Sequence, residues 1–105
     1  MIRAVFIQKN GTLCGLRISG HAGYADAGQD IVCAAVSSAV QYATILISEV
    51  FREPDSEQED HGTITVMLTH PEAGQASGVL DGLHQHLQFL SEDYPGTIQI
   101  QISDH

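Results

Sequence analysis

The residues of this chain that could do chemistry lie together in residues 20–35, where a glycine-rich loop runs into a long apolar segment. Asp30 stands at the junction, and its carboxylate is well suited to cap the first turn of a helix. Cys33 is then in that first turn, where the electropositive field of the helix N-terminus makes a thiol more acidic and favours the nucleophilic thiolate. The unpaired N–H groups of the same turn are suited to hold an oxyanion, as acyl transfer requires. The position of Cys33 therefore predicts a nucleophile.

One histidine lies in the same loop, twelve residues before Cys33, where a predicted strand ends. If that strand packs beside the start of the helix, the His21 imidazole reaches the thiol, takes its proton and later returns one to the leaving amine. Each residue also has an ordinary structural interpretation, because cysteine is a common small core residue and a loop histidine can stabilise a turn. The pair is more informative than either residue alone, and it indicates a Cys–His dyad.

Two further residues are candidates for supporting roles. Asp30 is foremost the helix cap, with a second possible role in orienting His21. Ser37 lies four residues after Cys33 on the same helical face, where it either hydrogen-bonds near the thiol or simply packs in the helix.

The loop itself carries Gly20, Gly23 and Gly28. Glycine supplies the backbone freedom of a loop that closes over substrate, although an ordinary tight connection uses it in the same way. We take this segment as the candidate substrate loop.

The remaining cysteine and histidines indicate no second site. Cys14 falls in a predicted strand and is expected to be a half-buried structural residue. His84 and His86 are two apart on a predicted helix, so their rings diverge and cannot share a metal ion. We expect no metal and no cofactor, and the chain has no phosphate loop and no dinucleotide fingerprint.

The elements that must position this site are predicted by periodicity. Residues 1–8 and 13–19 alternate around Asn10-Gly11, which predicts a β-hairpin with a type I′ turn. The other predicted elements are a helix over 31–51, a solvated acidic loop over 52–62, a strand over 63–69, a helix from Pro71 to about 92, and a strand over 97–103 with Ile98, Ile100 and Ile102 facing inward. The order β-β-α-β-α-β predicts an α+β sandwich in which helices cover one face of a four-stranded sheet. The first helix is apolar nearly all round, which predicts burial on more than one side, by the sheet and by a second subunit.

Length and charge limit the remaining possibilities. The 105 residues are enough for one domain, residues 1–105, with a single modest core. The formal charge of −9 repels phosphate backbones and attracts basic proteins, so no nucleic-acid partner is expected. The start of the chain shows no signal peptide, and polar residues interrupt the long apolar stretch, so we expect a cytoplasmic protein with reduced thiols and no membrane span.

Residues 20–37 resemble the signature of the ribosomal-processing cysteine protease family, Prp. The similar residues are Gly20-His21-Ala22, Gly28 and the run Asp30-Ile31-Val32-Cys33-Ala34-Ala35-Val36-Ser37. The resemblance implies a small bacterial cytosolic endopeptidase that forms homodimers and removes a short N-terminal extension from one large-subunit ribosomal protein, cutting just after aromatic residues. It also implies that Cys33 is the nucleophile and His21 the general acid and base, on a loop that moves when substrate binds.

A different class of function remains open from the sequence alone. The chain could be a non-catalytic acidic dimer that binds ribosomal or other basic proteins, with Cys33 as a core residue. A catalytic Cys33 reacts with iodoacetamide much faster than Cys14 does at neutral pH, whereas a core thiol is inert in the folded state.

Overall fold

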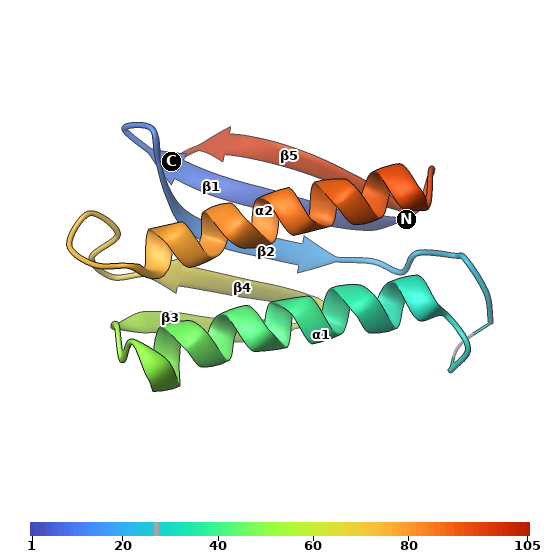
Figure 1. Cartoon of the computed structure of the whole chain (residues 1–105), viewed down its shortest axis with the longest axis horizontal. Coiled ribbons are helices and arrows are strands. Elements are labelled where there is room, and N and C mark those ends of the chain that lie inside the picture. The colour runs from blue at the N-terminus through green and yellow to red at the C-terminus, as the bar shows by residue number, and fades with distance from the viewer. Residues whose placement is uncertain (27) are drawn as a thin grey trace.

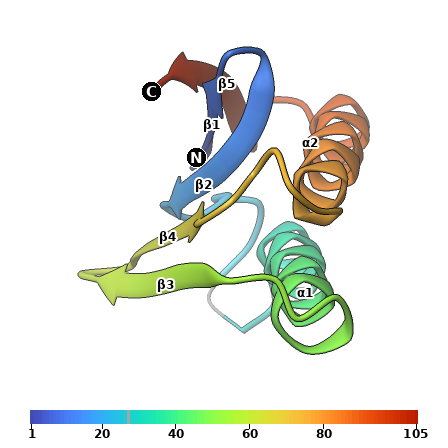
Figure 2. The same cartoon turned by 90° about the vertical axis from the view of Figure 1, so that its left-hand side faces the viewer.

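The computed structural model of the chain describes residues 1–26 and 28–105, and in it two helices cover one face of a mixed β-sheet (Figures 1 and 2). The sheet has five strands in the order β3-β4-β2-β1-β5, and only the pair of β1 and β5 is parallel. The strands are β1 (Ile2–Lys9), β2 (Thr12–Ser19), β3 (Asp55–Asp60), β4 (Thr63–Leu68) and β5 (Ile98–Asp104). The helices are α1 (Ile31–Ile45), which continues into a π-helical turn η1 (Leu46–Val50), and α2 (Ala76–Asp93). The predicted α+β class and the one-sided helical layer are confirmed, but the prediction of four strands is wrong.

The N-terminal hairpin forms as predicted. Asn10 and Gly11 both have positive φ, 54° and 79°, which is the geometry that a type I′ turn requires. β1 and β2 pair antiparallel from Arg3↔Ser19 to Lys9↔Thr12, with one bulge near Cys14. The hairpin therefore places the end of the central strand β2, and the loop that follows it, next to the start of β1.

The additional strand, β3, lies where the sequence was interpreted as a solvated loop. Its residues are all polar, so no apolar alternation marks them. The strand is held instead by backbone pairing with β4, from Asp55↔Leu68 to Asp60↔Thr63, across a turn in which His61 and Gly62 both have positive φ. A charged edge strand of this kind resists pairing with other chains.

The second helix begins later than predicted, at Ala76 and not at Pro71. The Glu53 carboxylate, which comes from the segment before β3, accepts hydrogen bonds from the backbone N–H groups of Gln75 and Ala76. Because Gln75 offers no side-chain cap of its own, this distant carboxylate satisfies the first turn and sets where the helix starts.

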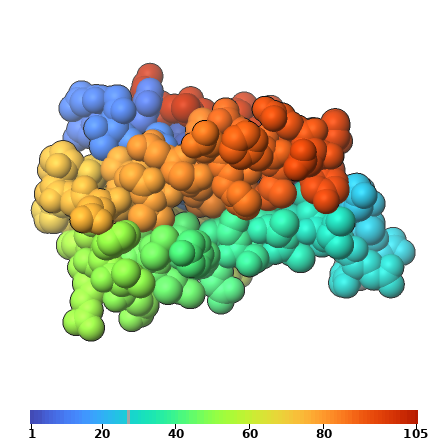
Figure 3. Space-filling view, in the orientation of Figure 1, coloured from blue at the N-terminus to red at the C-terminus, as the bar shows by residue number. Residues whose placement is uncertain are grey.

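The core lies between the sheet and the two helices. The helices lie side by side on one face of the molecule (Figure 3). Phe6, Leu16, Ile47, Leu80 and Leu87 are its largest fully buried side chains. β5 contributes less than predicted: Ile98 is buried, but Ile102 lies 51% exposed near the end of this edge strand.

Within this single chain the first helix is buried on one side, and the predicted burial of a second side by another subunit stays a prediction. Val32, Val36, Val40 and Ala43 face the core. On the opposite side, Tyr42 is 66% exposed, and other apolar side chains of this helix and its π-helical turn are also exposed: Ile31, Ile45 and Val50. This leaves an apolar surface without a partner in the monomer.

The continuous segment Ile31–Val50 is the one described helix long and apolar enough to cross a membrane by length and composition, with a mean hydropathy of 1.8. In the structure this segment packs against the sheet and beside α2. Four residues of its α1 part are buried in the core. Its apolar character is explained in part by that packing.

We expect Leu87→Ala to lower the free energy of unfolding by about 2–5 kcal/mol, because a fully buried leucine leaves a cavity when truncated. Phe89, two residues further along α2, is 56% exposed, so Phe89→Ala is the matched control and should change stability by no more than about 0.5 kcal/mol. Urea unfolding of both variants measures the difference, and equal losses would contradict this account of the core.

Candidate active site

Cys33 lies in the first turn of α1, and the local sequence explains why the helix begins there. Asp30 has an extended backbone, with φ −83° and ψ 100°, and its Oδ1 accepts hydrogen bonds from the backbone N–H groups of Val32 and Cys33, both at 3.0 Å. This is the predicted N-cap, and it is confirmed. Val32 is buried against the sheet, which turns the half-buried Cys33 toward the edge of the core.

His21 is positioned by the end of β2. Gly20 precedes it with φ 86°, and a Cβ at that position would collide with the main-chain carbonyl of Met1. Only glycine fits both the left-handed backbone and this close approach. Gly20 therefore turns the chain just after β2, beside the start of β1, and directs His21 toward the helix.

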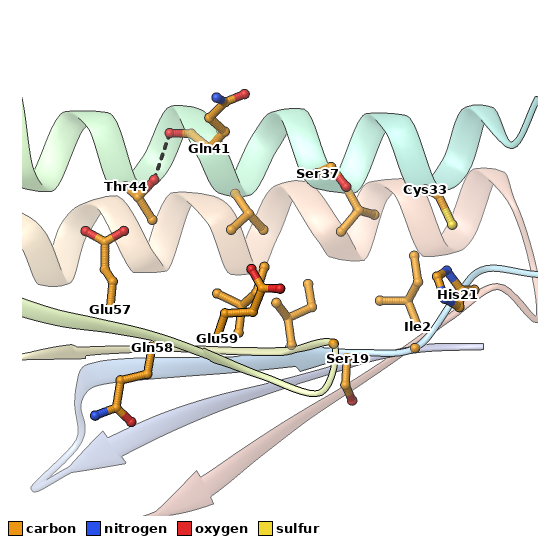
Figure 4. Close-up of a pocket in the computed structure, with 16 residues that line it drawn as sticks. Ile2, Ser19, His21, Cys33, Ser37, Gln41, Thr44, Glu57, Gln58 and Glu59 are labelled. Carbon is orange, nitrogen blue, oxygen red and sulfur yellow. Dashed lines mark hydrogen bonds between the residues drawn. The ribbon is translucent and has the colours of Figure 1, made fainter. Parts of the chain in front are cut away.

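Cys33 and His21 line the same cavity, and Figure 4 shows the sulfur directed toward the imidazole at one end of it. Within the described residues no hydrogen bond joins the two side chains. The sulfur instead accepts a hydrogen bond from the backbone N–H of Ala22, with the nitrogen 3.2 Å from Sγ. A backbone donor at this distance stabilises negative charge on the sulfur.

The second oxygen of Asp30 binds the loop. Oδ2 accepts hydrogen bonds from the backbone N–H groups of Tyr24, at 3.0 Å, and Ala25, at 3.5 Å. These bonds, and foremost the one from Cys33, hold the pKa of Asp30 below its ordinary value. With both oxygens bonded to amides, Asp30 makes no hydrogen bond to His21 in the part of the chain that the structure describes.

The loop has a second anchor in an aromatic pair. The ring of Tyr24 meets the ring of Tyr94, at the end of α2, edge to face with centroids 5.3 Å apart. Gly23 and Gly28 have positive φ, 69° and 86°, and a Cβ on either would meet nothing within 4 Å. Backbone conformation, and not crowding, therefore explains glycine at these two positions. Ala27 lies outside the described residues.

One expectation about the helix N-terminus needs correction. The N–H groups of Val32 and Cys33 were expected to be free to hold an oxyanion, but the Asp30 carboxylate occupies both. Donors to an oxyanion must therefore come from elsewhere, and the amides of Ala22, Tyr24 and Ala25 already donate to Cys33 Sγ and Asp30 Oδ2 in this structure.

The cavity extends well beyond the cysteine and histidine. Its volume is about 520 Å³, and it runs between α1 and the β3–β4 hairpin (Figure 4). Ser37, predicted to lie on the face of Cys33, lines it one turn further along the helix. The sequence analysis did not find the rest of the lining, because β3 was taken as a loop: the missed residues include Gln41, Thr44, Glu57 and Glu59.

Cys14 differs from Cys33 in its surroundings. It is buried, with 3% of its surface exposed, and burial raises the pKa of its thiol. It is more buried than the half-buried state that was predicted. Among residues 1–26 and 28–105, no three His, Cys, Asp or Glu side chains converge as metal ligands, and both cysteines are free thiols.

A half-buried cysteine in a helical first turn, with a backbone donor on its sulfur and a histidine in the same open groove, is the arrangement of a thiol peptidase. The comparison with protein families agrees with this class. The model of the family described as cysteine protease Prp matches residues 1–99, so this chain belongs to the Prp family of cysteine proteases.

Solved structures share the fold along the whole chain. The ribosomal processing protease Prp of Staphylococcus aureus, with a covalently linked product peptide, superposes with a TM-score of 0.92 at 23% identity, covering 98% of this chain and 100% of that one. The same protease with a substrate peptide gives 0.85 at 22% identity, covering 98% and 100%. A Streptococcus mutans protein gives 0.77 at 24% identity, covering 100% and 96%. The comparison with curated proteins gave no match.

Substitutions at Asp30 should separate its two tasks. Asp30→Ala removes all four bonds, so we expect its melting temperature to fall by several degrees at pH 7. Asp30→Asn keeps one acceptor oxygen for the helix cap but turns an amide N–H₂ toward the loop, so it should retain most of the melting temperature while amide exchange at Tyr24 and Ala25 quickens.

The pH dependence gives a second readout for the same change. Because the folded pKa of Asp30 is below its ordinary value of 3.8, its carboxylate stabilises the fold above that value, and the contribution is lost as pH falls through the lower folded pKa. The stability difference between wild type and Asp30→Ala should therefore be full at pH 7 and shrink below about pH 4. A difference that persists unchanged in acid would contradict the assignment.

Proposed function

We propose that this chain is a cytoplasmic cysteine endopeptidase that removes a short N-terminal extension from a large-subunit ribosomal protein, with Cys33 as nucleophile and His21 as general acid and base. The observation that carries the proposal is the Cys33 sulfur, which lies in an open groove with His21 and accepts a backbone hydrogen bond. Family membership supports the chemistry. The structural relative named as a ribosomal processing protease supports the substrate class.

In the first step His21 takes the proton of the Cys33 thiol, and the Ala22 N–H stabilises the resulting thiolate. The sulfur attacks the scissile carbonyl, and the carbonyl oxygen becomes an oxyanion, which we assign to amides of the loop that are freed when the loop rearranges around the peptide. The tetrahedral intermediate collapses, the C–N bond breaks, and His21 returns its proton to the leaving amine. The amino-terminal part of the substrate is then a thioester on Cys33.

In the second step a water molecule replaces the departed amine. His21 takes a proton from the water as its oxygen attacks the thioester carbonyl, and collapse of this intermediate breaks the C–S bond. The extension leaves as a carboxylic acid, and His21 returns its proton to the Cys33 sulfur, which restores the thiol. Ser37 lines the groove one helical turn from the sulfur, and we assign it a supporting contact to the bound peptide.

The charge of the chain suits this substrate. Its formal charge of −9 attracts a basic ribosomal protein and accelerates their encounter, an effect that salt screens. The predicted substrate loop, with Gly20, Gly23 and Gly28, carries His21 and connects β2 to α1, the helix of Cys33. We propose that this loop rearranges around the peptide, since its described part is held to the rest of the molecule by a few contacts, those with Cys33, Asp30 and Tyr94.

We also propose that two copies of the chain form a dimer through the exposed face of α1. Ile31, Ala34, Ser38, Tyr42 and Ile45 recur every three or four residues and are all exposed, so they form one stripe along the helix. The small residues at its middle let a second helix approach closely. A self-complementary stripe is suited to a two-fold dimer, the commonest symmetric assembly.

Cys33→Ala should abolish cleavage of a peptide that carries an aromatic-ended extension followed by the start of a ribosomal protein, since no other described thiol lies in the groove. Mass spectrometry of the products measures it. His21→Ala should lower kcat by about 100-fold or more, the contribution of a positioned acid–base group. Full turnover by Cys33→Ala would overturn the proposal.

Thiol alkylation provides the matched control. At neutral pH iodoacetamide should modify Cys33 much faster than Cys14, because Cys14 is buried and its pKa is raised. Equal, slow labelling of both thiols would favour the non-catalytic alternative.

Tyr42→Glu should convert the dimer to a monomer, because it puts a charge in the middle of the exposed α1 stripe. Phe89→Glu, on the exposed side of α2, is the control and should leave the dimer intact. Sedimentation equilibrium gives both masses. A wild-type protein that remains monomeric at micromolar concentration would contradict the assignment.

A further inference from the structure

The groove that begins at Cys33 and His21 continues along α1 for several turns. Ser37, Gln41 and Thr44 follow Cys33 on the helical wall, and Glu57 and Glu59 of β3 lie opposite the last two (Figure 4). From Cys33 to Thr44 the helix rises about 16 Å, which an extended peptide spans with about five residues. The far end of the groove is therefore within reach of a substrate bound at the cysteine.

The middle of this groove is apolar. Val36 and Val40 line it from the helix, and Ile18 and Ile64 line it from the sheet. All but Ile64 are buried, so this section of the groove offers apolar contact that excludes water, and its side chains offer no hydrogen-bond partner. Apolar substrate side chains suit this section, and any polar discrimination has to come from its ends.

The far end carries negative charge. Glu57 and Glu59 project toward α1, while Gln58 between them turns to the other face of the sheet (Figure 4). Ser48 donates a hydrogen bond to Glu57 at 3.0 Å, which leaves the charge in place. In the part of the chain that the structure describes, the one ion pair is that of Asp60 and His61, so no basic side chain neutralises Glu57 or Glu59.

A third carboxylate adds to the same charge. Asp55 lies beside Glu57, and its Oδ2 is closed off from solvent with no hydrogen-bond partner among the described residues. Burial and then the Glu57 carboxylate raise the pKa of Asp55 to about 6. The far end of the groove is thus a place where negative charges repel one another, and a cation arriving there would relieve that repulsion.

We propose that the far end of this groove, at Glu57 and Glu59, binds a cationic group of the peptide substrate about five residues from the scissile bond, with apolar residues between. The cation is a Lys or Arg side chain or a free N-terminal ammonium, which share the chemistry that two carboxylates recognise. This inference rests on the proposed function, because it takes the groove as the path of the substrate. It adds a specificity determinant remote from the nucleophile.

The test measures binding separately from cleavage. Fluorescein-labelled, N-acetylated peptides with one aromatic residue at the scissile bond carry a single Lys, moved one position at a time through both flanks. Kd is measured by anisotropy with the Cys33→Ala protein, and kcat/KM with the wild type. We expect one maximum, on one flank, about four to six residues from the bond, with Kd about three- to tenfold tighter than for the lysine-free peptide. Added salt should weaken that gain.

Two variants and one control locate the effect. Glu57→Gln and Glu59→Gln keep the shape of the groove but remove a charge, so each should reduce the advantage of the optimally placed Lys without weakening the lysine-free peptide. Asp81→Asn, on the exposed surface of α2, changes the net charge equally and should leave the advantage intact. A peptide without Lys but with a free amino terminus at the same distance distinguishes an ammonium at the chain end from a side chain.

The outcomes separate this inference from the function on which it rests. Cleavage that depends on Cys33 but is indifferent to the position of Lys would overturn the inference alone. A lysine optimum in binding with no cleavage by the wild type would overturn the peptidase proposal and leave the groove assignment standing. A lysine optimum that survives in both glutamine variants, or that is lost equally in Asp81→Asn, would also refute the assignment of the cation to Glu57 and Glu59.

Discussion

The Asp30 carboxylate joins the first turn of α1 to the loop that precedes it. One oxygen caps the first turn of α1 and so places Cys33, and the other holds the backbone of Tyr24 and Ala25 in the preceding loop. Because His21 and Ala22 belong to that loop, the distances from the imidazole and the amide donor to the sulfur depend on this carboxylate together with the Tyr24–Tyr94 contact. Its exposure to solvent makes the tie adjustable, which is what a site that must admit a polypeptide requires.

Burial distinguishes the two thiols of this chain. Cys14 is closed within the sheet, where the charged form is disfavoured. Cys33 stands where the helix emerges from the core, between the buried Val32 and the open groove, and it receives a backbone hydrogen bond. The same groove has an apolar middle and an acidic end, so the proposed nucleophile on α1 and the proposed cation-binding carboxylates on β3 belong to one continuous groove.

Local signals predicted the part of the site closest to the nucleophile. Asp30 is a strong cap and Asn10-Gly11 a strong turn, and the resemblance noted in residues 20–37 agrees with the family match over residues 1–99. The acidic wall was missed because β3 owes its form to backbone pairing with β4 and has no apolar residue to mark it. The start of α2 was missed for a related reason, since its cap comes from the distant Glu53. Elements whose form depends on contacts between residues distant in the sequence cannot be predicted from local periodicity.

The remote cap on α2 has a consequence for the order in which the chain assembles. Helices are costly to nucleate, and the first turn of α2 lacks an acceptor of its own until the segment carrying Glu53 has come into place. That segment in turn is fixed by η1 on one side and by β3 on the other. The amino-terminal turn of α2 thus closes only after the middle of the chain has docked, which makes it a late step in folding.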